Sequence, residues 1–215
     1  MSRYNDEQSR YCYPGTDVLK NKVNIRDAVA LGAYELSMTL LRTSQLKEHP
    51  LAGKFDLKHL QSIHYHLFKD VYPFAGKLRT EGIAKDNFPF ALPQYMQDEA
   101  QDLFRQLKAE KNLSGLPADK FAERAAHYMA EINVLHPFRE GNGRTQREFI
   151  RCLAHFNGYA LEWERTNPQQ LLHASIRSVS NTDALTQQIH NCLVNKEPDP
   201  AIAQQYKTNA QALER

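Results

Sequence analysis

Apolar positions recur at helical spacing along most of this 215-residue chain. The spacing predicts helices at about 25–47, 56–70, 94–111, 118–134, 143–157, 168–178 and 183–195. Between residues 80 and 91, two short β-capable stretches flank Asp86-Asn87 and predict the one pair of strands. After residue 196 the composition turns polar, and residues 201–215 predict a loosely attached helix or a linker. We therefore expect an all-α fold with one small hairpin.

Two of the predicted helices meet at a loop between residues 135 and 143. On the first helix, Phe121, Tyr128 and Ile132 fall on one face. Pro137 disfavours helical geometry at the residue before it, so this helix should end just before His136. His136 is thus expected on a helix-terminating turn.

The second helix carries an apolar stripe and an arginine face. The stripe is made of Phe149, Ile150, Leu153 and Phe156. Arg144, Arg147 and Arg151 lie on the opposite face at about 100° per residue. We expect the stripe to bury the helix and to leave the arginines for a ligand.

The loop between the two helices has the chemistry of a phosphate site. The glycines of Gly141-Asn142-Gly143 allow backbone amides to turn toward one point at the positive end of the following helix. Arg144 and Arg147 add donors suited to phosphate oxygens. Glu140 beside a polyphosphate indicates a bridging cation such as magnesium. His136, with an ordinary pKa of about 6.5, could accept a proton from an incoming hydroxyl.

The run from residue 136 to 149 reads HPFREGNGRTQREF and resembles the signature of the Fic family, HxFx(D/E)GNGRxxR. The stretches 13–16, 55–64 and 74–80 are also similar to that family, so the resemblance covers roughly residues 10–195. It implies the Fic fold, a helical bundle around a helix–loop–helix motif with a β-hairpin flap. The expected domain is 1–195, with a core at about 55–195, followed by a polar helix or linker at 196–215.

The resemblance implies a protein adenylyltransferase, an enzyme that moves AMP from ATP to a hydroxyl of a target protein. The roles that it implies are His136 as the base, Glu140 as the Mg²⁺ ligand, Phe138 as a structural residue, Gly141, Asn142 and Gly143 at the α-phosphate, and Arg144 and Arg147 at the β- and γ-phosphates.

Residues Thr80–Ala91 fit the family's flap. In the flap, Lys85 and Asp86 would border the nucleotide. An extended segment of the target would pair with the flap as an added strand. The residues expected to dock the target are Ile83, Phe88 and Phe90.

The resemblance also implies control by a glutamate opposite Arg147. In the family this glutamate follows the pattern Ser/Thr-x-x-x-Glu-Gly/Asn, and Ser44–His49 departs from it because His49 replaces Gly or Asn. We therefore expect an ordinary helix end before Pro50, and a small separate antitoxin that supplies the glutamate beside the early helices. Stand-alone toxins of this type imply a type II topoisomerase subunit as the target.

Other readings of the motif stay open. Relatives that transfer phosphate carry a bulkier, lysine-bearing loop, so Gly141 and Gly143 favour AMP transfer. Relatives that transfer phosphocholine or remove AMP are further alternatives, as are a secreted effector acting on host GTPases and a catalytically silent binding module. A DNA-binding helical domain is the weakest alternative, because the net charge of +2 is mild and the basic residues are scattered.

The remaining features change the picture little. Cys12, Cys152 and Cys192 are far apart and lack metal-ligand spacing, which indicates a reducing compartment and predicts a cytoplasmic protein. His64 lies on the same predicted helix as Leu60 and Leu67, and we expect it in the core rather than at a metal. No apolar run approaches a membrane span, and residues 1–10 do not form a signal peptide.

Overall fold

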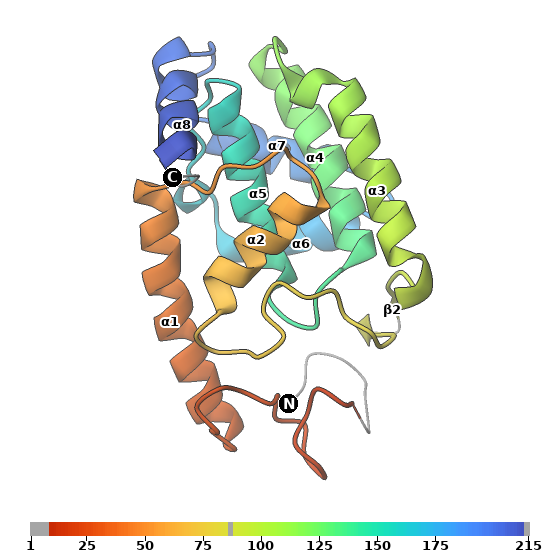
Figure 1. Cartoon of the computed structure of the whole chain (residues 1–215). Helices are drawn as coiled ribbons and strands as arrows, with labels where there is room; N and C mark the ends of the chain where they lie inside the picture. Colours follow the sequence, from red (N-terminus) through yellow and green to blue (C-terminus); the bar gives the residue numbers. More distant parts are fainter. Residues whose placement is uncertain (1–8, 86–87, 213–215) are drawn as a thin grey trace.

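Helix α5 (Asn142–Phe156) runs through the middle of a bundle of helices in a computed structural model that describes residues 9–85 and 88–212 (Figure 1). The helices around it are α1 (Ala28–Glu48), α2 (Leu57–Phe68), α3 (Pro93–Ala109), α4 (Ala118–Leu135), α6 (Pro168–Arg177), α7 (Asp183–Cys192) and α8 (Pro200–Ala212). Two short 3₁₀ helices, Lys111–Leu113 and Trp163–Arg165, connect them. The seven predicted helices and the all-α class are confirmed.

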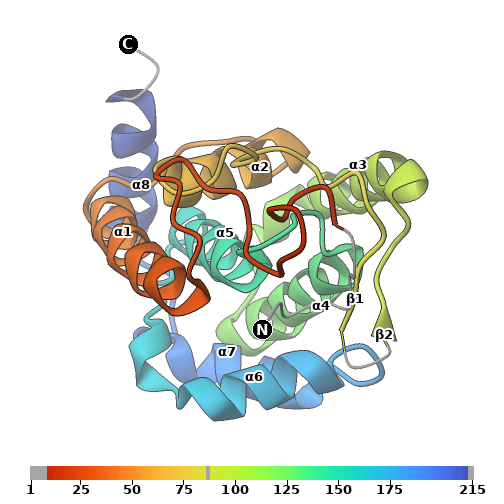
Figure 2. The same cartoon turned by 90° about the horizontal axis from the view of Figure 1, so that it is seen from below.

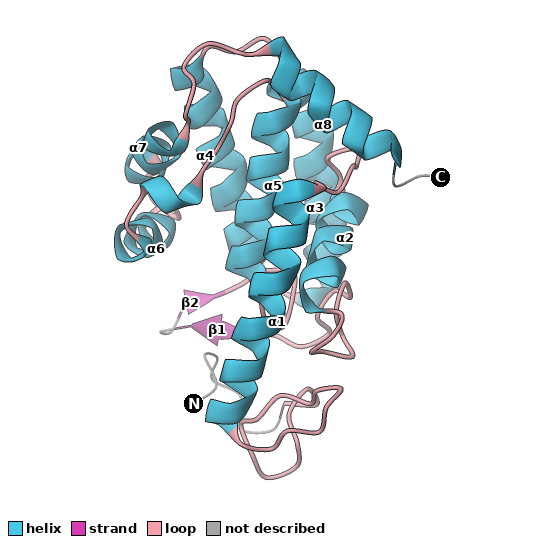
Figure 3. Cartoon of the chain, turned by 90° about the vertical axis from the view of Figure 1, so that its left-hand side faces the viewer, coloured by secondary structure: helices cyan, strands magenta, loops and turns pink. Residues whose placement is uncertain are grey.

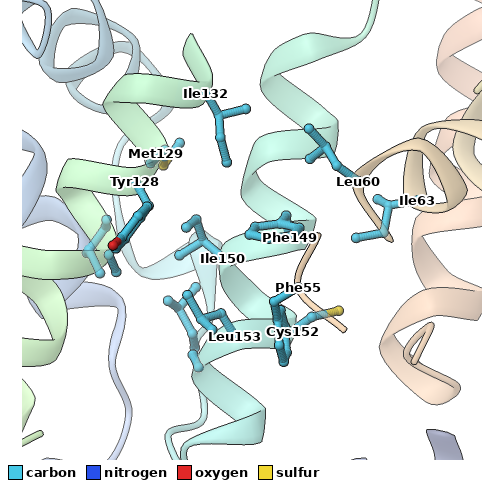
Figure 4. Close-up of a cluster of buried hydrophobic side chains, with 14 of the residues drawn as sticks. Phe55, Leu60, Ile63, Tyr128, Met129, Ile132, Phe149, Ile150, Cys152 and Leu153 are labelled. Atoms are coloured by element: carbon cyan, nitrogen blue, oxygen red, sulfur yellow. The ribbon is translucent and has the colours of Figure 1, made fainter. Parts of the chain in front are cut away.

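The apolar stripe of α5 forms the centre of the core. Figure 4 shows Phe149, Ile150 and Leu153 of α5 between side chains of α4 on one side and of α2 on the other. All three α5 side chains are fully buried. Burial of large apolar side chains contributes about 1.5–3 kcal/mol each, so this contact holds the helix–loop–helix in place.

Side-chain caps set where three of the helices begin. Asp27, Asp56 and Asn167 each accept hydrogen bonds from amides of the first turn of α1, α2 and α6. Pro168 follows Asn167 at the first helical position, where its missing N–H costs nothing. These local signals explain why the predicted starts lie close to the observed ones.

The C-terminal helix α8 is more firmly attached than the sequence predicts. Its Tyr206 is only 4 % exposed, and its ring lies 6.3 Å from the ring of Phe55 and 6.4 Å from that of Phe156. The Tyr206 hydroxyl donates to the carbonyl of Leu51 at 3.2 Å. Loose attachment was wrong because a single aromatic in a polar helix carries too little periodic signal.

The predicted hairpin is present. Strands β1 (Ala84–Lys85) and β2 (Phe88–Pro89) are antiparallel, with Ala84 opposite Pro89 and Lys85 opposite Phe88. Figure 3 shows the hairpin on the side of the bundle opposite α8.

The N-terminal segment passes over the end of the bundle near the hairpin (Figure 2). The Ser9 hydroxyl and the backbone amide and guanidinium of Arg10 donate to the carboxylate of Glu81, just before β1. No helix in the described part of the chain is long and apolar enough to cross a membrane.

Candidate active site

Helix α4 ends in a left-handed turn at His136, which has φ 44° and ψ 60°. Pro137 follows, and it disfavours a further helical residue. The imidazole is 8 % exposed, its ring lies 3.8 Å from the ring of Phe90, and Nδ1 is 3.2 Å from the carbonyl oxygen of Asn133. The tautomer that donates from Nδ1 to this carbonyl carries its lone pair on Nε2, as a base requires.

Burial holds His136 in its neutral form. The pKa of the imidazole is lowered to about 3, mainly by burial and also by the positive charges of Arg79 and Lys85, whereas the hydrogen bond to the Asn133 carbonyl raises it. His136 is therefore unprotonated at neutral pH and able to accept a proton.

Gly141 makes the turn that leads into α5, and no other residue fits there. Its φ is 81°, and a Cβ at this position would lie 2.2 Å from Cζ of Phe68. The Asn142 side chain closes the same loop by accepting from the backbone N–H of Phe138 at 2.9 Å and donating to its carbonyl at 2.7 Å. Both ends of the Asn142 side-chain amide are used inside the loop, so the group that Asn142 offers to a phosphate is its backbone amide.

The loop leaves an anion site at the start of α5. The first amides of a helix have no partner within it, and here they belong to Asn142, Gly143 and Arg144. Gly143 is exposed, and a Cβ there would lie 3.5 Å from Nη1 of Arg147. The backbone of this turn is open to a close approach by a ligand.

Glu140 lies next to this anion site and is buried. Its Oε1 accepts from the Gly141 amide at 2.9 Å and lies 3.4 Å from Nη2 of Arg144. Its backbone carbonyl accepts from Nε2 of His64 at 2.9 Å, while Nδ1 of His64 accepts from the Gly76 amide at 2.7 Å. His64 is fully buried, which confirms it as a core residue, and it fixes the orientation of the loop.

Phe138 has the structural position expected for it. Its side chain is 1 % exposed, and its ring stacks on the His64 ring at 3.9 Å with an interplanar angle of 12°. The stack joins the loop to α2.

The three arginines of α5 have different surroundings. Arg147 is half-buried, and its side chain makes no hydrogen bond or ion pair among residues 9–85 and 88–212. Burial lowers the pKa of Arg147, and the positive charge of Arg144 lowers it further. Two neighbouring cations with this much burial form a site for an anion.

Arg144 and Arg151 are bound to other side chains, which the helical pattern did not predict. Nη2 of Arg144 donates to Glu35 of α1 at 2.6 Å, and its guanidinium lies 4.7 Å from the centre of the Phe68 ring. Arg151 is 5 % exposed and donates to both oxygens of Glu148. Arg151 is therefore structural, and the prediction that it is left for a ligand is corrected.

The hairpin places Lys85 at the site and buries its own apolar residues. Ile83 is 4 % exposed and Phe90 is 9 % exposed, with Phe90 stacked on His136. The prediction that these two side chains dock a target is corrected, because they support the hairpin from beneath. Asp86 lies outside the described residues, as does the side chain of Phe88.

The base, the anion site and the hairpin surround one cavity of about 1030 Å³. Its walls include Lys85, Phe90, His136, Glu140, the turn 141–143, Arg144 and Arg147, and apolar residues of α6 such as Leu171 and Ile176. This volume is at the upper end of the range for small-molecule sites.

Gln146 is a wall residue that the sequence did not single out. Its side chain is 2 % exposed, and Nε2 is buried with no hydrogen-bond partner among the described residues. A buried donor of this kind costs about 1–3 kcal/mol unless a ligand or water accepts from it. Only burial reveals it, since Gln on a helix is otherwise unremarkable.

A metal at this site would have few protein ligands. Among the residues the structure describes, no group of three or more His, Cys, Asp or Glu is placed to hold an ion. The single buried carboxylate of Glu140 beside an anion site fits a magnesium ion held mainly by substrate phosphates.

Comparison with known proteins agrees with this geometry. A model of the Fic/DOC family matches residues 54–154. The chain is 41 % identical over 204 residues to the protein adenylyltransferase VbhT of Bartonella schoenbuchensis, covering 93 % of this chain and 43 % of VbhT. It is 40 % identical to the probable protein adenylyltransferase y4lH of Sinorhizobium fredii, covering 84 % of this chain and 93 % of that protein.

Solved structures show the same fold. The N-terminal Fic domain of a Bartonella quintana effector with bound ADP has a TM-score of 0.80 and 28 % identity, covering 89 % of this chain and 96 % of that chain. BepC of Bartonella tribocorum with bound AMPPNP has a TM-score of 0.78 and 26 % identity, covering 88 % and 97 %. Although the chain spans less than half the length of VbhT, it spans nearly all of y4lH. The chain belongs to the Fic/DOC family.

Proposed function

We propose that this chain is a protein adenylyltransferase that transfers AMP from ATP to a hydroxyl of a target protein. The observation that carries the proposal is the neutral His136 on the same cavity as the first turn of α5 and Arg147. Relatives about 40 % identical are named protein adenylyltransferases, and two related structures hold ADP and AMPPNP.

The phosphates occupy the start of α5. The amides of residues 142–144 bind the α-phosphate, since the positive end of the helix favours an anion there. Arg147 binds the terminal phosphates with a guanidinium that has no competing partner among the described residues. Arg144 also binds the phosphates, and its guanidinium is held in place by Glu35, whose carboxylate accepts from Nη2 at 2.6 Å.

Glu140 would hold a magnesium ion together with the phosphates. When bound, the ion neutralises charge on the phosphate oxygens, which would otherwise repel the carboxylate. Glu140 is positioned for this by the bond from His64 to its backbone carbonyl.

The transfer step uses His136 as the base. The target hydroxyl gives its proton to Nε2 of His136 as its oxygen attacks the α-phosphorus. A bond forms between that oxygen and phosphorus, and the bond from phosphorus to the β-phosphate oxygen breaks, so pyrophosphate leaves. The hairpin binds an extended segment of the target by adding a strand, and Lys85 borders the nucleotide.

A small antitoxin is the partner that we propose for control. Helix α1 exposes Leu36 at 57 % and Leu40 at 61 %, spaced one turn apart, and Leu40 also lines the cavity. An amphipathic helix docked along this face could place a glutamate opposite Arg147. Glu48 of the chain itself is exposed at the end of α1 and makes no ion pair with any described residue.

One labelling experiment separates the candidate reactions. The protein is incubated with a lysate and ATP that carries ³²P at either the α- or the γ-phosphate, with His136→Ala as the control. AMP transfer labels a target from α-³²P-ATP only, whereas phosphate transfer labels it from γ-³²P-ATP only. Absence of label from both, in lysates that include type II topoisomerases and GTPases, would support a silent binding module and refute the proposal.

The antitoxin is tested in cells. The chain is expressed alone, as Glu48→Gly, and together with small open reading frames adjacent to its gene. Suppression of labelling and toxicity by one small protein supports the proposal. A large gain of labelling in Glu48→Gly alone would instead show that the chain restrains itself.

A further inference from the structure

Arg79 is a buried cation that bonds to the backbone on both sides of the site. We propose that Arg79 is a positioning residue, one that holds His136 and both stems of the hairpin in fixed relation to each other. This inference rests on the proposed function, because it assigns the residue that sets the geometry of the AMP transfer.

All three guanidinium nitrogens of Arg79 donate to backbone carbonyl oxygens. The side chain is 2 % exposed, and its Nε donates to the carbonyl of His136 at 2.8 Å. Its Nη2 donates to the carbonyls of Leu135 at 3.2 Å and Ala91 at 2.5 Å, and its Nη1 donates to that of Glu81 at 2.6 Å. Its backbone amide adds a bond to the carbonyl of Pro137 at 2.9 Å.

The first consequence concerns the base. The last carbonyls of a helix lack intrahelical partners, and they form the negative end of the helix, where a cation is favourable. The left-handed conformation of His136 costs roughly 1–2 kcal/mol for a residue with a side chain, so it persists only where its surroundings enforce it. Arg79 binds the carbonyls on both sides of this strained residue, at Leu135 and His136 itself.

The second consequence concerns the hairpin. Glu81 precedes β1 and Ala91 follows β2, so the same guanidinium holds both stems. Two further contacts join the stems to the base. The Ala91 amide donates to the carbonyl of Val134 at 3.2 Å, and the ring of Phe90 stacks on His136. A target strand paired with the hairpin is thereby held at a fixed position relative to Nε2 of His136.

Only an arginine can fill this place. A planar guanidinium offers five donors in fixed directions, whereas a lysine ammonium offers three from one point and cannot reach four separated carbonyls. Displacement of a reacting group by about 1 Å can reduce the rate of an enzyme about 100-fold. Loss of the Arg79 guanidinium should therefore reduce the rate of AMP transfer even in a variant that still folds.

The contacts of Arg79 separate its effect on catalysis from an effect on nucleotide binding. The four carbonyls that its guanidinium binds belong to residues 81, 91, 135 and 136 and not to the turn at the start of α5, and Arg79 is not among the residues that line the cavity. Turnover should therefore fall much more than ATP affinity, because the phosphates bind at the start of α5 and at Arg147 and only Lys85 of the hairpin borders the nucleotide. A merely structural residue would lower stability and affect both parameters together.

The experiment compares Arg79→Lys and Arg79→Ala with Arg10→Ala. Arg10 is the matched control, because its exposed guanidinium also bonds to Glu81 but reaches neither His136 nor Ala91. Melting temperature and ATP affinity are measured first. Trp163, the one tryptophan of the sequence, lines the cavity and provides a fluorescence signal for ATP binding. Steady-state AMP transfer is then measured with and without added guanidinium.

We expect kcat to fall about 10- to 100-fold in both Arg79 variants. ATP affinity should stay within about twofold of the wild-type value, and Arg10→Ala should resemble the wild type. Guanidinium should partly restore turnover in Arg79→Ala and have no effect on Arg79→Lys. Wild-type kcat in a folded Arg79→Lys, or an equal loss of kcat and ATP affinity, would overturn the proposal.

A second readout does not depend on activity. Hydrogen exchange at the amide of Phe90, which donates to the carbonyl of Ile83 at 3.1 Å, reports the hairpin stems, and the imidazole NMR signals of His136 report the base. Both should change in folded Arg79→Lys and not in Arg10→Ala. If the wild type transfers no AMP, the proposed function fails, while unchanged exchange and unchanged imidazole signals would refute the positioning role by themselves.

Discussion

The two glycines of the motif should respond in opposite ways to the same substitution. Gly141 has a φ of 81°, and a Cβ there would lie 2.2 Å from Cζ of Phe68. An alanine in this conformation costs about 1–2 kcal/mol in backbone strain. The overpacking adds about 1–3 kcal/mol, because Phe68 is fully buried and stacks on His64. Gly141→Ala should therefore lower the free energy of unfolding by about 2–5 kcal/mol.

Gly143 is the matched control, two residues away in the same turn. A Cβ there would meet Nη1 of Arg147 at 3.5 Å, an ordinary contact, and its backbone is not in the left-handed region. Gly143→Ala should leave stability unchanged or raise it by up to about 1 kcal/mol through helix propensity. It should still weaken ATP binding, because the added methyl stands where a phosphate must approach the amides.

Urea unfolding followed by circular dichroism measures both stabilities, and Trp163 fluorescence measures ATP affinity. For a chain of this size, a loss of 2–5 kcal/mol lowers the melting temperature by about 4–20 °C. An unchanged urea midpoint for Gly141→Ala would refute the steric argument. Equal destabilisation of the two variants would show that loss of glycine flexibility, and not the contact with Phe68, decides stability.

Three further predictions concern the titratable groups of the site. His136→Ala should reduce AMP labelling on the order of 10²- to 10⁴-fold with an unchanged circular dichroism spectrum, and near-wild-type labelling would remove His136 from its role. Because the pKa of His136 is about 3 in the folded protein and about 6.5 when unfolded, its stabilising contribution is complete above pH 6.5 and is lost as the pH falls toward 3. Lowering the pH from 6.5 to 5 should thus cost wild type about 2 kcal/mol more than His136→Asn in urea unfolding, and equal losses would contradict the neutral assignment. Glu140→Gln should raise the magnesium concentration needed for half-maximal labelling, whereas identical titrations in both proteins would refute Glu140 as the metal ligand.

Much of this protein could be predicted because the relevant signals are local. The helix caps at Asp27, Asp56 and Asn167 act within one turn, and the apolar stripe of α5 shows its helical period directly. The base, the glycines and the arginines of the motif lie within twelve positions, so one turn and one helix bring them together. The hairpin could be predicted because its two strands lie only a few residues apart in the sequence.

The details that failed depend on partners far away in the sequence. Arg151 lies on the α5 face predicted for a ligand, yet it is buried and its Nη2 donates to the carbonyl of Leu46, 105 positions away. Arg144 on the same face is held by Glu35, 109 positions away, a partner that the helical pattern does not indicate. Ile83 and Phe90 were predicted to contact a target from the hairpin, but both side chains are buried beneath it. Periodicity states which face of an element a residue occupies, but not which segment packs against that face.

The class of fold, the positions of the helices and the reactive groups of the motif follow from neighbouring residues, because helical period, caps and a contiguous loop are local properties of the chain. The way in which those groups are held depends on contacts between distant segments. The bonds of Arg79 to His136, of His64 to Glu140 and of Tyr206 to Leu51 span 57, 76 and 155 positions. Such contacts exist only after distant segments pack together, and burial then determines that the base is neutral, since removal from water disfavours the charged imidazole.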